Sequence, residues 1–132
     1  MLKKEVWELF AINYQSREPI YEQLYNNVVR LIGMGVLSPH EKLPTVRALA
    51  QQLGINPNTV SKSYQMLEQN GYIYSAVGKG SFVADNSAVI NGKQEEAKKD
   101  LIKALKTASD VGITKEEVIA AVNDIYFGGD GK

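Results

Sequence analysis

The sequence of 132 residues contains no cysteine. This absence excludes disulfide bonds, thiolate zinc sites and a cysteine nucleophile. An excess of one charge is missing as well, because 15 lysines and arginines balance 15 aspartates and glutamates. Residues 1–84 carry eight basic and six acidic side chains, whereas residues 85–132 carry seven and nine. A surface for a polyanion must therefore come from the placement of a few cations or from duplication in a dimer.

Long apolar runs and catalytic motifs are also missing. No apolar stretch approaches the roughly 18 residues that a membrane span needs, and the N-terminal run MLKKEVWELF lacks the apolar core of a signal peptide. The only histidine is His40, and no phosphate-loop or paired-carboxylate motif accompanies it. We therefore expect a soluble cytoplasmic protein with no enzymatic activity, membrane association, cofactor or metal.

Periodic apolar residues predict helices in the first half of the chain. Loose alternation over residues 6–14 predicts a short strand or extended arm. Apolar residues at three- and four-residue spacing from Ile20 onward predict a helix over about residues 19–34, with Pro19 in its first turn. A second helix is expected to begin after the capping residue Thr45 and to end at a glycine.

A third helix is predicted to begin at Asn56 and Pro57, an asparagine cap followed by proline at the first helical position, and to run to Gly71. Two short helices joined by a glycine-containing turn are the sequence form of a helix-turn-helix. After Gly71 the period becomes that of strands, and the runs YIYSA and SFVAD flank the glycine-rich tip VGKG. A hairpin that directly follows a helix-turn-helix is a wing.

The second part of the chain contains two more helical patterns. Residues 85–92 are small, polar and rich in turn formers, which predicts a linker. Beyond them a capping box of Thr114 and Glu117 separates two amphipathic segments. The expected fold class is mainly α with a small β-hairpin wing: a winged helix-turn-helix domain over residues 1–84, the linker over 85–92 and a helical dimerisation tail over 93–132.

Polar and cationic side chains at the start of the third helix suggest DNA binding. The N-terminal end of a recognition helix enters the major groove, where asparagine can pair with adenine and hydroxyls or lysine can reach phosphates. Glycines in the wing permit a close approach of its backbone to DNA. The candidate DNA-binding residues are Lys42, Thr45, Arg47, Asn56, Asn58, Thr59, Ser61, Lys62, Tyr64, Gly78, Lys79 and Gly80. Each also has a structural explanation, such as a solvated helix face, a hairpin glycine or, for Tyr64, core packing.

The run KLPTVRALAQQLGINPNTVSKSYQMLEQNGYIYSAVGKGSFV resembles the DNA-binding domain of the GntR family of bacterial regulators. The preceding EPIYEQLYNNVVRLI is similar to the first helix of that family, so the resemblance covers about residues 10–84. It implies a dimeric, usually ligand-responsive repressor or activator. The short remainder resembles the YtrA-type subgroup, in which a tail of two helices serves mainly in dimerisation.

The resemblance also implies roles for single residues. Arg47 matches an arginine that reads DNA, Thr59 matches a threonine that contacts phosphate, and Gly80 matches the glycine of the wing tip. Many members carry arginines in the recognition helix where this chain has Pro57 and Ser61. Base specificity is therefore expected to depend more on Arg47, the other polar residues of the third helix and the wing.

The tail predicts a dimer. A hairpin of two short helices has too little apolar area to be stable unattached, so its apolar face must be covered by the first domain or by a second chain. Pairing through the tail would imply a palindromic operator. The expected dimerisation residues are Leu101, Leu105, Val118, Val122 and Ile125. A small-molecule effector is conceivable but not identified, and a winged helix used for protein interaction without DNA is the alternative function.

Overall fold

The computed structural model describes residues 10–85 and 87–126. The described residues form two compact units, which divide between Ser87 and Ala88. The elements, in chain order, are α2 (Ile20–Gly33), α3 (Val46–Leu53), α4 (Pro57–Gln69), β1 (Ile73–Ala76), β2 (Gly80–Val83), α5 (Ser87–Asp110) and α6 (Lys115–Ile125). The described structure is mostly helical and contains one antiparallel hairpin, which confirms the fold class predicted from the sequence.

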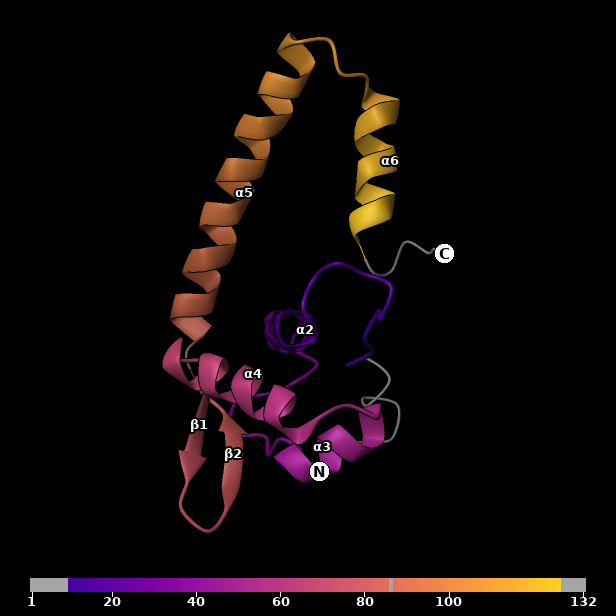
Figure 1. Cartoon of the computed structure of the whole chain (residues 1–132). Helices are drawn as coiled ribbons and strands as arrows, with labels where there is room; N and C mark the ends of the chain where they lie inside the picture. Colours follow the sequence, from indigo (N-terminus) through magenta and orange to yellow (C-terminus); the bar gives the residue numbers. More distant parts are fainter. Residues whose placement is uncertain (1–9, 86, 127–132) are drawn as a thin grey trace. The chain divides into compact units, whose positions relative to one another are not determined.

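Helix α4 is the centre of the first unit. It packs against α2, α3 and β1, with α2 on one side and α3 and the hairpin on the other (Figure 1). The buried apolar core consists of Phe10, Leu24, Val28, Leu31, Ile32, Leu37, Leu43, Leu49, Ala50, Val60, Tyr64, Leu67, Tyr72, Ile73 and Val83. Burial of these side chains by all five elements of the unit fixes α4 relative to the hairpin.

The predicted capping residues begin and end the two helices of the helix-turn-helix. The backbone N–H of Ala48 donates to Thr45 Oγ1 at 3.0 Å at the start of α3, and Gly54 ends that helix in the left-handed conformation at φ 70°. The backbone N–H of Asn58 donates to Asn56 Oδ1 at 2.8 Å at the start of α4. The turn between the two helices is therefore set by local chemistry.

Of the two alternatives predicted for residues 6–14, a short strand or an extended arm, the strand is not formed by the described residues of this segment. Residues 6–9 lie outside the described part, and residues 10–14 form no strand. The backbone N–H of Asn13 instead donates to Gln23 Oε1 at 2.8 Å, and Gln23 Nε2 donates to the Asn13 carbonyl at 3.1 Å. A buried glutamine of α2 thus takes the place of a neighbouring strand. Pro19 precedes α2 as its N-cap instead of lying in its first turn.

The wing contains a third extended segment beside the β1–β2 hairpin. Strand β2 pairs with β1 from Ile73 opposite Val83 to Ala76 opposite Gly80. On its other edge, Lys42 forms an isolated bridge with Phe82. The Leu43 N–H donates to the Ser81 carbonyl and the Val83 N–H to the Glu41 carbonyl, both at 2.9 Å. The wing is therefore tied to the chain that leads into α3.

The second unit consists of α5, α6 and the turn between them. Helix α5 begins at Ser87, so residues 87–92 of the predicted linker are its first turns, Gly92 included. A glycine inside a helix costs about 1 kcal/mol, which lengthening an established helix can offset because propagation is easier than nucleation. The capping box forms as predicted: the Glu117 N–H donates to Thr114 Oγ1, and the Thr114 N–H donates to the Glu117 carboxylate.

No residue of α5 or α6 is buried within the described chain. Of the predicted dimerisation residues, Leu105 and Val118 are half-buried and the other three are exposed. The large apolar side chains exposed in the described part of this unit are Val89, Leu101, Ile102, Val111, Ile113, Ile119, Val122, Ile125 and Tyr126. Across the described residues, no helix combines the length and apolarity required to cross a membrane.

Candidate nucleic-acid interface

The start of α4 presents the polar residues that the sequence singles out. Asn56 and Asn58 are exposed, and Thr59 and Ser61 are half-buried. The Asn56 side chain caps the helix and holds the Asn58 backbone N–H, so its first role is structural. Asn58, one residue into the helix, is placed at the end that enters a major groove in helix-turn-helix proteins.

Helix α3 contributes an arginine and a hydroxyl at its own start. Arg47 is exposed on the first turn of α3. Thr45 Oγ1 accepts a hydrogen bond from the Ala48 N–H, and its own proton is still available to a phosphate oxygen. Capping and phosphate contact are therefore compatible at Thr45.

Tyr64 is used inside the domain. The residue is 7% exposed, and its hydroxyl donates to the Pro44 carbonyl at 2.7 Å. Burial raises the pKa of Tyr64. The donated proton is not available to a phosphate, so the geometry differs from the expectation that this hydroxyl reaches DNA. Tyr64 instead fixes the KLPT segment, and with it the start of α3, against α4.

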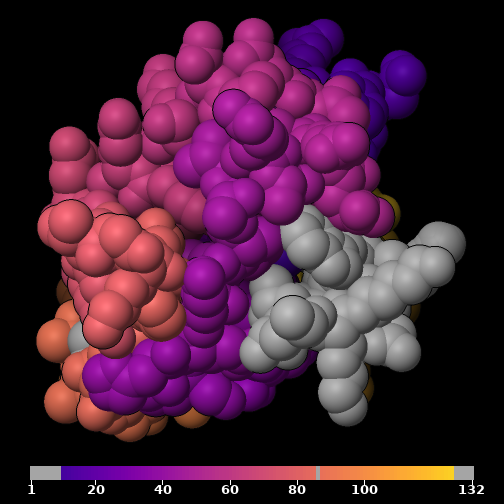
Figure 2. Space-filling model, turned by 90° about the horizontal axis from the view of Figure 1, so that it is seen from below, coloured from indigo at the N-terminus to yellow at the C-terminus, as the bar shows by residue number. Residues whose placement is uncertain are grey.

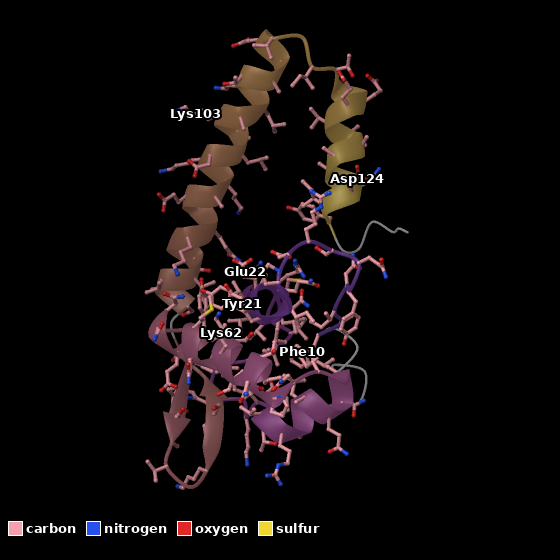
Figure 3. The ribbon with its side chains drawn as sticks, in the orientation of Figure 1. Phe10, Tyr21, Glu22, Lys62, Lys103 and Asp124 are labelled. Carbon is pink, nitrogen blue, oxygen red and sulfur yellow. The ribbon has the colours of Figure 1, made fainter. Side chains whose placement is uncertain are left out.

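Lys62 is turned toward α2. Its Nζ lies 3.8 Å from the centroid of the Tyr21 ring, a cation–π geometry, and Figure 3 shows the two labelled side chains together between α2 and α4. The Ser63 hydroxyl donates to the Tyr21 carbonyl at 2.6 Å in the same region. Tyr21 and Ser63 thus join α2 to the recognition helix. The sequence pattern of α4 alone did not show this, since it does not reveal what faces Lys62.

The wing brings two further cations to the same face. Lys79 is exposed at the tip between Gly78 at φ 75° and Gly80 at φ 115°. Lys42 comes from the third extended segment, alongside β2. Figure 2 shows the helix-turn-helix, in purple and magenta, beside the salmon-coloured wing on one face of the protein. The cations of this face are therefore contributed by three separate parts of the chain.

The acidic residues among these elements already accept hydrogen bonds. Glu41 Oε1 accepts from the Ser38 N–H at 2.9 Å, and Glu68 Oε1 accepts from the Ser75 hydroxyl at 3.0 Å. Both carboxylates keep their negative charge, but residues 40–83 carry four lysines and arginines against these two glutamates, so positive charge is in excess there. Within the described residues, no group of three histidines or carboxylates could hold a metal ion.

Comparison with known proteins shows similarity to a family of bacterial regulators. The family model of the bacterial regulatory proteins of the gntR family matches residues 20–83. The HTH-type transcriptional repressor YtrA of Bacillus subtilis is 34% identical over 119 residues, which cover 89% of this chain and 92% of the repressor. The chain belongs to the GntR family.

Two solved structures of GntR-type proteins are similar to this chain. YtrA from Sulfolobus acidocaldarius, a GntR-family transcription factor, is 31% identical, with a TM-score of 0.59 over 74% of this chain and 98% of that one. The DNA-binding domain of AraR, in complex with operator ORX1, is 31% identical, with a TM-score of 0.52 over 57% of this chain and 96% of that domain.

These relatives confirm the winged helix-turn-helix and the YtrA-type subgroup predicted from the sequence. The likeness to the Bacillus subtilis repressor extends over nearly the full length of this GntR protein, tail included. The family consists of DNA-binding transcriptional regulators. The roles of single residues in DNA binding stay predictions, and the geometry favours Arg47, Asn58 and the wing cations over Lys62 and Tyr64.

Proposed function

We propose that this GntR protein is a sequence-specific repressor that binds double-stranded DNA as a homodimer on a palindromic operator and has no enzymatic activity. The observation that carries the proposal is that the helix-turn-helix and the wing lie beside each other on one face of the protein (Figure 2), and that Arg47, Asn58 and Lys79 are exposed on these elements. The likeness to a transcriptional repressor and to a domain solved with its operator supports it.

The division of labour on this face follows from chemistry. Arg47 and Asn58 end in planar groups with two hydrogen-bonding positions, which suits bidentate contacts to guanine and adenine. Lys42 and Lys79 are flexible point charges, which suits phosphates. We therefore assign base reading to Arg47 and Asn58 and backbone contacts to the two lysines.

The tail supports pairing of two copies. Its apolar side chains, with Leu101 and Val122 among them, are not buried by the unit to which they belong. A single winged helix contacts few base pairs, and a two-fold dimer doubles the contacts. The proposed half-sites lie about 10 bp apart, or a multiple of that spacing.

The test of sequence reading is a gel shift on the promoter of the protein's own gene, with a scrambled duplex as competitor. Arg47→Ala and Asn58→Ala should each reduce the preference for the promoter by about 1–3 kcal/mol, the value of one base contact. Arg30→Ala is the control, because Arg30 lies in the last turn of α2, on the other side of α4 from α3 and the wing.

Two outcomes would change the proposal. An equal loss of affinity for the promoter and for the scrambled duplex in the alanine variants would indicate that Arg47 and Asn58 contact phosphates and not bases. Wild-type protein that binds neither duplex would favour the alternative of a protein-interaction module.

A further inference from the structure

Lys42 lies across strand β2. Lys42 pairs with Phe82, and Phe82 and Gly80 are two residues apart on β2, so their side-chain positions are on the same face of the strand. A diagonal neighbour at this spacing is within reach of a long side chain. The extended Lys42 side chain reaches Gly80 in this way.

The contact at Gly80 is close. A Cβ atom at Gly80 would lie 3.1 Å from Lys42 Cε and 3.9 Å from Lys42 Nζ. The first distance is shorter than ordinary carbon–carbon contact, which is about 3.5–4.0 Å. A methyl group at Gly80 would therefore require the end of Lys42 to move by a few tenths of an ångström, and a larger side chain would displace it further.

The other tip glycine provides a comparison within the same hairpin. Gly78 also has a positive φ, 75° against 115° for Gly80, but a Cβ atom there would meet nothing within 4 Å. Backbone conformation explains glycine at both positions. Only Gly80 has, in addition, a cationic side chain across it.

We propose that Gly80 positions Lys42: the missing side chain lets the lysine cross β2 and present its ammonium group to a DNA phosphate beside the wing tip. Gly80 is thus a positioning residue that acts through Lys42, and the phosphate contact rests on the proposed function. Lys42 approaches Gly80 across the strand, and Lys79 directly precedes Gly80 in the chain.

The first measurement needs no DNA. In protein labelled with ¹³C at lysine, the Lys42 Cε resonance is assigned by its absence in Lys42→Ala. Gly80→Ala should shift that resonance, and Gly78→Ala should leave it in place. An unchanged Lys42 resonance in Gly80→Ala, with thermal unfolding showing a folded protein, would overturn the positioning role.

The second measurement is the salt dependence of binding to a scrambled duplex, since phosphate contacts do not depend on sequence. Lys42→Ala should reduce the slope of log K against log salt by about 0.9 for each protomer bound. Gly80→Ala should reduce the slope in the same direction, and Gly35→Ala, a change at another glycine with positive φ and no atom within 4 Å of its Cβ position, should retain the wild-type slope.

The double variant Lys42→Ala, Gly80→Ala separates positioning from backbone strain. If Gly80 acts through Lys42, the double variant has the slope of Lys42→Ala alone, because no lysine is left to displace. An effect of backbone strain would be present with or without the lysine and would add to that of Lys42→Ala. Additive losses would overturn the proposal. The salt slopes could change as expected while the wild-type protein shows no preference for its promoter over the scrambled duplex. That result would contradict only the proposed sequence-specific function.

Discussion

At the scale of single residues, one tyrosine connects the recognition helix to the segment before α3. The Tyr64 hydroxyl donates to the Pro44 carbonyl from a buried position. A hydrogen bond of this kind typically contributes about 1 kcal/mol net to stability. Removal of the hydroxyl would leave the Pro44 carbonyl without this partner. Tyr64→Phe should therefore lower the free energy of unfolding by about that amount at neutral pH, measured by urea denaturation.

The same residue predicts a dependence on alkaline pH. Because burial raises the pKa of Tyr64, the unfolded chain loses this proton near the ordinary value of about 10 while the folded protein keeps it. The stability linked to Tyr64 is complete below that pH and falls as the pH rises above it. The stability of Tyr64→Phe, measured by urea denaturation across this pH range, should decline less steeply than that of wild type.

The residue scale also shows where sequence reasoning succeeded and where it could not. Thr45 and Asn56 were predictable as caps, because capping depends on neighbours within three residues. The partners of Lys62 and Lys42 were not predictable, since Tyr21 and Gly80 are each about 40 residues distant along the chain. The amphipathic pattern says which face of α4 is polar, but not which neighbouring element a polar side chain meets.

At the scale of elements, the capping box of α6 should respond to acid. The backbone N–H of Thr114, and then its hydroxyl, lower the pKa of Glu117. Thr114→Ala removes the hydroxyl but keeps the N–H, so the Glu117 pKa should rise part of the way to its ordinary range, as measured by NMR titration. Thr114→Ser keeps both groups and should titrate like wild type; an unchanged pKa in the alanine variant would assign the whole effect to the backbone.

The sign of this effect fixes its pH range. A carboxyl whose pKa is lowered by folding contributes stability above its ordinary pKa, and that contribution disappears as the pH falls through the lowered value. The capping box is therefore complete at neutral pH, and the start of α6 should lose helicity in acid.

The beginning of α5 shows the limit of local signals. The run DNSAVING has the composition of a linker, yet residues 87–92 belong to a helix of 24 residues. The later part of α5 is rich in lysine, glutamate and alanine, which are strong helix formers. A helix that such residues establish can extend through weaker ones, so a boundary between elements is harder to predict than their existence.

At the scale of the whole molecule, the proposed dimer can be tested through side chains of the tail. Leu101→Ala and Val122→Ala shorten exposed apolar residues without weakening helix propensity, because alanine is the best helix former. If these residues meet a second copy, each truncation should weaken association, and the double variant should sediment as a monomer at concentrations where wild type is dimeric.

A matched control is available on the same helix. Lys99 lies two residues before Leu101, almost opposite it on α5, so Lys99→Ala should leave association unchanged. Wild-type protein that sediments as a monomer would overturn the dimer, and a double variant that remains dimeric would show that the tail residues are not in the interface.

Dimerisation through the exposed apolar residues of the tail would also make operator occupancy depend on the concentration of the protein. If only the dimer binds the operator, operator occupancy rises with the square of the chain concentration, as long as that concentration is well below the dissociation constant of the dimer. Halving the number of chains would then reduce occupancy about fourfold. The apolar side chains of α5 and α6 would thus make repression depend more steeply on the number of chains than it would for a regulator that binds as a monomer, so that dilution during cell growth relieves it sooner.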